Sequence, residues 1–206
     1  MYSPLIQKII NLFSKFPSIG PKTAARFVFY LTKMPKEDFD DLINSLIELK
    51  EKIKLCPFCF NFFEGENELC EICSSPLRDK KTLCIVEKET YLQSIENTTK
   101  YNGLYFVLGG TLSNLRKKDI EKLRIQELTD RIKEPQKFNI STNGFEEIIL
   151  AINPTPEGEA TILYLERLLK PLNIKISKLA KGLPIGGELE YADIETLSSA
   201  LENRKE

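Results

Sequence analysis

The chain has 206 residues, 42% of them hydrophobic and 29% charged, with a net charge of −1 and no histidine. The composition is that of a globular protein, and the sequence contains no run of about 18 apolar residues that could span a membrane. The absence of histidine excludes Ser-His-Asp and Cys-His catalysis, and every zinc site that needs an imidazole ligand.

Basic residues are concentrated at the N-terminus. Residues 1–36 contain six lysines or arginines and no acid, so this segment carries +6 and the remainder −7. Such an arm favours contact with phosphate, because the field of these charges acts within about 8–10 Å. The alternative is an ordinary exposed helical surface whose lysines face solvent, which would have the same composition. Lys8 and Lys15 also interrupt the apolar residues that a secretory leader needs, so we expect a cytoplasmic protein with reduced cysteines.

Three helices are predicted in residues 1–54. Ser3 and Pro4 form a helix-start signal, and apolar residues then recur at helical spacing as far as Phe16. Proline and glycine between residues 17 and 21 break this helix and open a second one. A third helix begins after Pro35. We expect its apolar face to pack on the first two helices; the face consists of Phe39, Leu42, Ile43, Leu46 and Ile53.

The break between the first two helices resembles a helix-hairpin-helix, in which a tight turn containing glycine joins two helices. Gly20 lies in this turn, where backbone N–H groups at the start of the second helix suit a phosphate. Lys22 and Arg26, four residues apart, would flank the same phosphates, and Lys15 precedes the turn. Ser18 stands where such turns usually have their first glycine. A purely structural turn between core helices is the alternative.

Four cysteines in residues 55–78 form two C-x2-C pairs separated by ten residues: Cys56, Cys59, Cys70 and Cys73. Two tight turns that face each other present four thiolates at the distance of about 2.3 Å that tetrahedral zinc requires. Four ligands fill the coordination shell, so the pattern predicts one structural zinc ion in a small module without a core of its own. Free or disulfide-bonded thiols are the alternative. Cys84, inside an apolar run, is interpreted as a buried packing thiol.

From residue 79 to 177 short apolar runs alternate with amphipathic stretches. The runs at 83–86, 104–108, 148–152 and 174–176 predict strands of a mostly parallel sheet. Residues around 120–128 and 160–169 supply helices for the crossovers. The fold class is therefore an α/β domain. A glycine-containing segment from residue 178 leads to a final helix near 192–201.

Acidic and polar residues follow two of these strands, as in the Toprim domain of topoisomerases and primases, which this region resembles. In that domain a strand-end Glu and an Asp-x-Asp pair hold magnesium. Glu87 matches the Glu, but Asn153 and Thr155 stand at the pair and carry no charge, so catalysis should fail. Glu157 and Glu159 could help to hold a weakly bound magnesium ion, or cap the helix that follows, which is the preferred interpretation.

Taken together and in this order, the motifs resemble the RecR family of recombination mediator proteins. They are the hairpin at 17–22, the four cysteines, and the segments 84–87, 105–110, 153–159 and 182–190. The resemblance covers nearly the whole chain. It implies a helix-hairpin-helix module at 1–54, a zinc module at 55–78, a Toprim domain at 79–177 and a C-terminal tail at 178–206.

The resemblance also implies a function. Proteins of this family form ring-like oligomers and work with RecO and RecF to help load RecA onto single-stranded DNA. By this match Lys22 and Arg26 are DNA contacts, the four cysteines are zinc ligands, and the region around Glu157 and Glu159 faces partners.

Three functions remain open from the sequence. The first is a non-enzymatic DNA-binding mediator associated with the bacterial nucleoid, without strong sequence preference. The second is a metal-dependent Toprim nuclease or primase-like enzyme that takes its acids from unusual positions. The third is a protein-interaction scaffold that never touches DNA.

Overall fold

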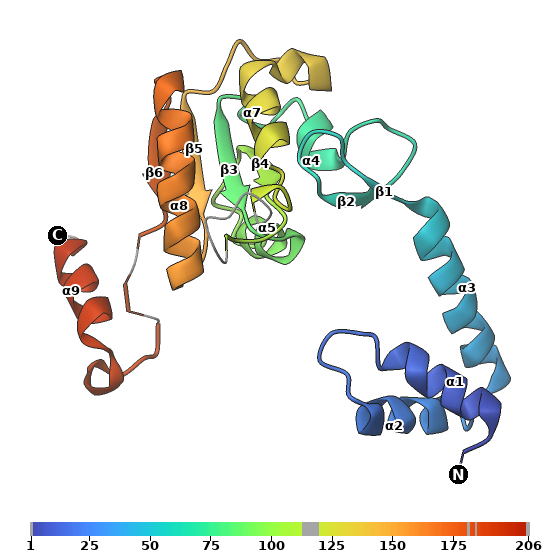
Figure 1. Cartoon of the computed structure of the whole chain (residues 1–206). Helices are drawn as coiled ribbons and strands as arrows, with labels where there is room; N and C mark the ends of the chain where they lie inside the picture. The colour runs from blue at the N-terminus through green and yellow to red at the C-terminus, as the bar shows by residue number, and fades with distance from the viewer. Residues whose placement is uncertain (1, 113–119, 181, 184, 205–206) are drawn as a thin grey trace. The chain divides into compact units, whose positions relative to one another are not determined.

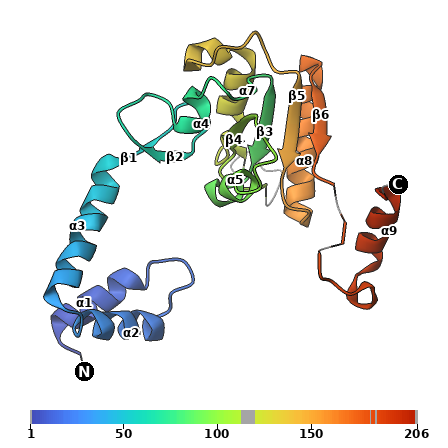
Figure 2. The same cartoon turned by 180° about the vertical axis from the view of Figure 1, so that it is seen from behind.

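The computed structural model describes residues 2–112, 120–180, 182–183 and 185–204. The chain divides into two compact units, Met1–Ile53 and Lys54–Glu206, shown from opposite sides in Figures 1 and 2. Among the described helices, none is both long enough and apolar enough to cross a bilayer. Of the tail motif at 182–190, Pro184 lies outside the described residues.

The first unit contains α1 (Pro4–Phe13), α2 (Pro21–Leu31) and α3 (Lys36–Lys52). Ser3 caps α1 as predicted, because its side chain accepts a hydrogen bond from the backbone N–H of Ile6 at 3.3 Å. Helices α1 and α2 share a small core whose buried members are Ile10, Ala24 and Val28. Helix α1 ends three residues earlier than the apolar pattern suggested, and Phe16 lies exposed in the connecting turn.

The expectation that α3 packs on the first two helices is wrong. No residue of α3 is buried. Its apolar side chains are exposed at Phe39, Leu42, Ile43, Leu46, Ile47 and Leu49. The amphipathic pattern made the helix predictable, but a pattern alone does not specify which surface the apolar face meets.

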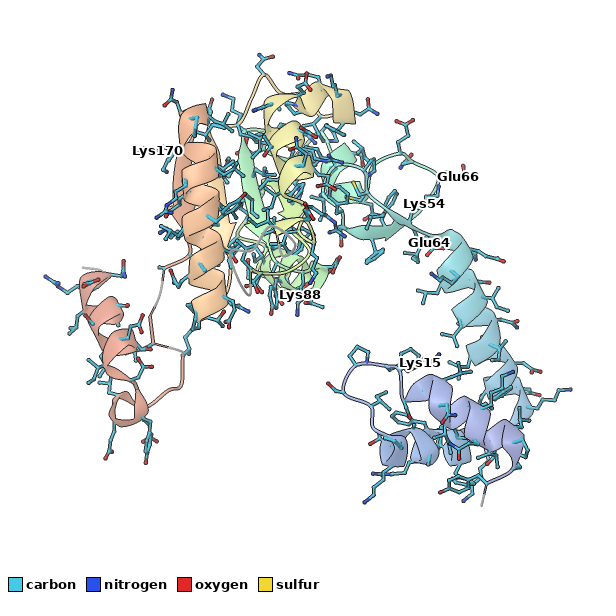
Figure 3. All side chains as sticks on the ribbon, in the orientation of Figure 1. Lys15, Lys54, Glu64, Glu66, Lys88 and Lys170 are labelled. Carbon is cyan, nitrogen blue, oxygen red and sulfur yellow. The ribbon has the colours of Figure 1, made fainter. Side chains whose placement is uncertain are left out.

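The second unit begins with the zinc module. Strands β1 (Ile53–Leu55) and β2 (Phe62–Glu64) pair into a two-stranded sheet, and α4 (Glu71–Ser74) follows. Figure 3 labels Lys54, Glu64 and Glu66, which lie on the strands and on the loop after them. All four cysteines of the module are buried, together with Phe58 and Leu69, in a cluster that continues into the α/β domain. The module is therefore packed into a larger core.

The α/β domain is built on a four-stranded sheet in the order β4-β3-β5-β6, with every neighbouring pair parallel. The strands are β3 (Thr82–Val86), β4 (Leu104–Val107), β5 (Glu147–Ala151) and β6 (Lys175–Lys178). All four lie at the predicted runs. In β3 and β4 almost every residue is buried, and the β-branched and aromatic residues there favour parallel strands. The mostly parallel sheet of the prediction is confirmed.

Helices cover both faces of this sheet (Figures 1 and 2). Leu83 and Ile85 point to the face covered by α7 (Ile125–Lys133) and α8 (Pro156–Leu169). Cys84 and Val86 point to the opposite face, where Leu92 of α5 (Glu89–Glu96) packs. The alternation along β3 is the two-residue period of a strand. Helix α5 was not predicted from the sequence, because only eight residues form it.

Short 3-10 helices connect some of these elements: η1 (Pro135–Phe138), η2 (Lys170–Leu172) and η3 (Leu189–Tyr191). The predicted C-terminal helix is confirmed as α9 (Ile194–Glu202), and the side chain of Asp193 caps its first turn.

Candidate functional site

The four cysteines converge on one point. Their sulfur atoms all lie within 4.8 Å of one another, and the Cys59 and Cys70 sulfurs are 3.6 Å apart. A regular tetrahedron of thiolates around zinc has edges of about 3.8 Å, so the spacing fits the ion. The backbone N–H of Asn61 points at the Cys59 sulfur at 3.4 Å. In the described part of the chain, these four residues are the only group of three or more Cys, His, Asp or Glu close enough to share a metal ion.

Thiols packed this closely cannot all ionise without a cation. The hydrogen bond between Cys56 and Cys59 lowers the pKa of Cys56 and raises that of Cys59. Neighbouring thiols and burial also raise the pKa of Cys73 well above its ordinary value. A zinc ion supplies the positive charge that lets all four become thiolates. Cys84 lies apart on β3, where burial raises its pKa to about 12, and it is the inert packing thiol that was predicted.

The predicted DNA-contact residues gather around the turn between α1 and α2. Gly20 is the N-cap of α2, and no side chain caps this helix start. Lys15, Lys22 and Arg26 are all exposed, and Figure 3 shows Lys15 in the loop before α2. A Cβ atom built on Gly20 would meet nothing within 4 Å, so the turn surface is open to a ligand. The first turn of α2 contains no acid to oppose an anion.

Ser18 adopts the backbone conformation that glycine usually adopts in such turns. Its φ is 61°, in the left-handed region, whereas Gly20 has an extended backbone with φ of −84°. Left-handed backbone is uncommon for residues with a Cβ atom. The tight turn therefore forms with serine at its first glycine position.

The strand-end residues of the α/β domain form a hydrogen-bonded corner. Glu87 follows β3 and is 5% exposed, and its carboxylate accepts a hydrogen bond from the backbone N–H of Asn153 at 2.6 Å. The Asn153 amide donates to the Tyr91 hydroxyl at 2.9 Å. Thr155 is the N-cap of α8 and accepts from the N–H of Gly158. Glu87 thus fixes the end of β5.

The remaining acids lie in the first turn of α8. Glu157 is exposed and Glu159 is half-buried, both where the helix dipole favours negative charge. In the described residues they do not join Glu87 in a group able to share a metal ion. Gly158 lies between them because a Cβ atom at that position would collide with the carbonyl oxygen of Asn153. The backbone of α8 consequently approaches the end of β5 more closely than a side chain would permit.

Sequence reasoning missed the residues that join the zinc module to the α/β domain. The backbone N–H of Val107 on β4 donates to the carbonyl of Cys59 at 2.8 Å. The Arg131 guanidinium donates to the carbonyl of Pro57 at 2.9 Å, and the Lys80 ammonium donates to that of Cys73 at 2.7 Å. The contacts of Val107 and Arg131 join residues far apart in sequence, so no local pattern predicts them, and the contact of Lys80 spans seven residues of irregular chain.

Comparison with known families divides the chain into four consecutive matches. Residues 6–50 match the RecR helix-hairpin-helix, and residues 53–75 match the RecR zinc finger domain with four cysteine ligands. Residues 81–180 match the Toprim domain, and residues 182–205 the RecR C-terminal domain. The four matches occur in the order in which the motifs were found.

Curated relatives agree over the full length. The chain is 45% identical over 205 residues to the recombination protein RecR of Bifidobacterium animalis subsp. lactis, covering 100% of this chain and 98% of the relative. It is 43% identical over 204 residues to that of Chloroherpeton thalassium, covering 99% and 98%. It is also 43% identical over 206 residues to that of Rippkaea orientalis, covering 100% and 99%. With its zinc-binding cysteines, its hairpin and its Toprim sheet, the chain belongs to the RecR family of recombination proteins.

Proposed function

We propose that this protein is a non-enzymatic, DNA-binding recombination mediator. It works with RecO and RecF to help load RecA onto single-stranded DNA, in the cytoplasm and at the nucleoid. The observation that carries the proposal is the uncapped, acid-free start of α2 with Lys22 and Arg26 exposed beside it. Backbone N–H groups and flexible cations at one helix end hold phosphate without reading bases, so little sequence preference follows.

Two features of the α/β domain support a role without catalysis. The carboxylate of Glu87 is buried and occupied by the backbone of Asn153, so it is poorly placed to hold a hydrated magnesium ion. The side chains of Asn153 and Thr155 are uncharged, and they are already hydrogen-bonded to Tyr91 and Gly158. The surface around Glu157 and Glu159 is then available for a partner protein.

Self-association into a ring-like oligomer is part of the proposal. The exposed apolar side chains of α3 support it, because a soluble protein rarely leaves such a series uncovered. A second copy of the chain is the occupant that we propose for this face. The tail from residue 178 onward, in which Leu189, Tyr191 and Ile194 are exposed, is a second candidate for contacts between copies.

A salt titration of DNA binding tests the DNA contact. The logarithm of the affinity should fall linearly with the logarithm of salt concentration, with a slope of about −0.9 for each phosphate neutralised. Lys22→Ala should reduce the magnitude of this slope by about one unit. Lys50→Ala, which removes an exposed lysine in the last turn of α3, is the matched control and should leave it unchanged. A slope of zero, even with RecO present, would favour a scaffold that does not bind DNA.

Incubation of labelled DNA with the protein and magnesium or manganese tests the absence of catalysis. We expect neither cleavage nor synthesis. Turnover that depends on metal and disappears in Glu87→Ala would contradict the proposal and establish the Toprim enzyme instead.

A further inference from the structure

The zinc centre buries a charge that residues 55–77 cannot balance with side-chain cations. Four thiolates and one Zn²⁺ carry two net negative charges. The four cysteines are at most 2% exposed. Residues 55–77, which surround them in sequence, contain four glutamates and no lysine or arginine. Because a buried charge is costly unless it is paired, compensating cations must come from elsewhere in the chain.

Two cations of the α/β domain reach the module, one at each cysteine pair. Arg131 of α7 donates from its guanidinium to the carbonyl of Pro57, between the first two cysteines, at 2.9 Å. Lys80, just before β3, donates to the carbonyl of Cys73 at 2.7 Å. Arg131 is 8% exposed and Lys80 is half-buried. Each cysteine pair therefore has a positive charge beside its backbone.

Neither cation has a carboxylate partner at ion-pair distance among the described residues. Other basic residues nearby do: Arg78 pairs with Glu96, and Lys81 pairs with Glu146. Burial lowers the pKa of Arg131, opposed by the charges of Glu127, Asp130 and Cys56.

Phe60 holds the Arg131 guanidinium in place. Its ring lies 4.7 Å from the guanidinium carbon of Arg131 and 4.6 Å from that of Arg124. Phe60 has a φ of 62°, a conformation that costs a bulky residue about 1–3 kcal/mol, so this placement must be stabilised by its surroundings. The guanidinium of Arg124 donates instead to the carbonyl of Val107, on β4. The two arginines thus share a ring, but only Arg131 also bonds to the cysteine turn.

We propose that Arg131 and Lys80 are the counter-charges of the zinc tetrathiolate, and that they position the metal against the α/β domain. They stabilise the charged, metal-bound state of the thiolates at each cysteine pair. When zinc leaves, the thiolates become protonated and no longer compensate the burial of the two cations. Metal loss therefore also loosens α7 and the start of β3.

Zinc release from the full-length protein tests this proposal. The protein is first saturated with zinc. The transfer of zinc to an excess of a chromogenic chelator is then followed with time. Arg131→Met and Lys80→Met should each accelerate release by about 10–100-fold, the range typical of lost groups around a metal's ligands. Arg131→Lys keeps the charge and should retain most of the wild-type rate. Arg124→Met and Lys81→Met are the matched controls and should release zinc within about threefold of wild type.

Cobalt separates a charge effect from a packing effect. With Co²⁺ as the probe, the thiolate-to-metal absorption bands should shift in Arg131→Met and Lys80→Met, because the sulfurs lose a nearby positive charge. The bands should stay in place in Arg124→Met. The proposal is overturned if Arg131→Met and Lys80→Met match their controls in both zinc release and cobalt spectrum, even if they melt at a lower temperature. It is also overturned if Arg131→Lys is as defective as Arg131→Met.

Discussion

The two units of this protein differ in how they use their apolar residues. The helical unit buries Ile10, Ala24 and Val28 and leaves the apolar face of α3 exposed. The second unit buries residues on both faces of its sheet and includes the zinc module in the same core. The comparison shows that the helical unit, which contains the hairpin, is thinly packed. In the second unit, the four cysteines and the sheet share one continuous core.

The largest effect is expected from Cys70→Ser in the second unit. Loss of one thiolate should abolish zinc binding, which contributes about 10–16 kcal/mol in small zinc peptides, and unfold the module. Because the cysteines belong to the core of the α/β domain, β4 should lose protection too. Metal analysis and hydrogen exchange measure both. Cys84→Ser should keep its zinc, while unchanged metal content and thermal stability in Cys70→Ser would contradict the comparison.

The next effect concerns the thin core of the first unit. Ile10→Ala should cost about 2–5 kcal/mol of unfolding free energy, because the side chain is buried and few neighbours can refill the space. Urea unfolding followed by hydrogen exchange should show α1 and α2 exchanging early while the sheet stays protected. Leu12→Ala, at a half-exposed position of α1, should cost far less. Equal loss of protection in β3 and β5 would show that the units are not independent.

A smaller effect is expected at the strand-end corner. Glu87→Ala removes the acceptor of the backbone N–H of Asn153 and should cost about 0.5–1.5 kcal/mol, the net contribution of a partly buried hydrogen bond. Glu87→Gln keeps an acceptor oxygen and should stay close to wild type. Chemical denaturation of the two variants separates them. If Gln were as damaging as Ala, the charge of Glu87 would matter more than its hydrogen bond.

The smallest effect on folding is expected on α3. Leu46→Asp should change the unfolding free energy of the monomer by no more than about 0.5 kcal/mol, because the residue is exposed. It should nevertheless weaken self-association, measured by light scattering over a range of concentrations. Asn44→Asp adds the same charge to an exposed position two residues away and is the control. If the oligomer mass of Leu46→Asp were unchanged, α3 would not be part of the proposed interface.

Local sequence patterns predicted much of the fold and the zinc ligands. The cysteine spacing predicted the zinc ligands, because two tight turns can present four sulfurs only in a narrow range of arrangements. The apolar runs predicted the sheet, because strands buried on both faces, such as β3 and β4, need continuous apolar sequence. Helix α5 escaped because its eight residues give too few turns for a clear period.

What the tertiary structure alone decided lies in contacts between distant residues. The sequence determined that α3 has an apolar face, but only the fold shows this face uncovered. It determined that Glu87 ends a strand, but only the packing of β5 beside β3 places the Asn153 backbone at its carboxylate. Arg131 meets the first zinc turn for the same reason. Hydrogen bonds and charges act over a few ångströms in space, whatever the distance along the chain.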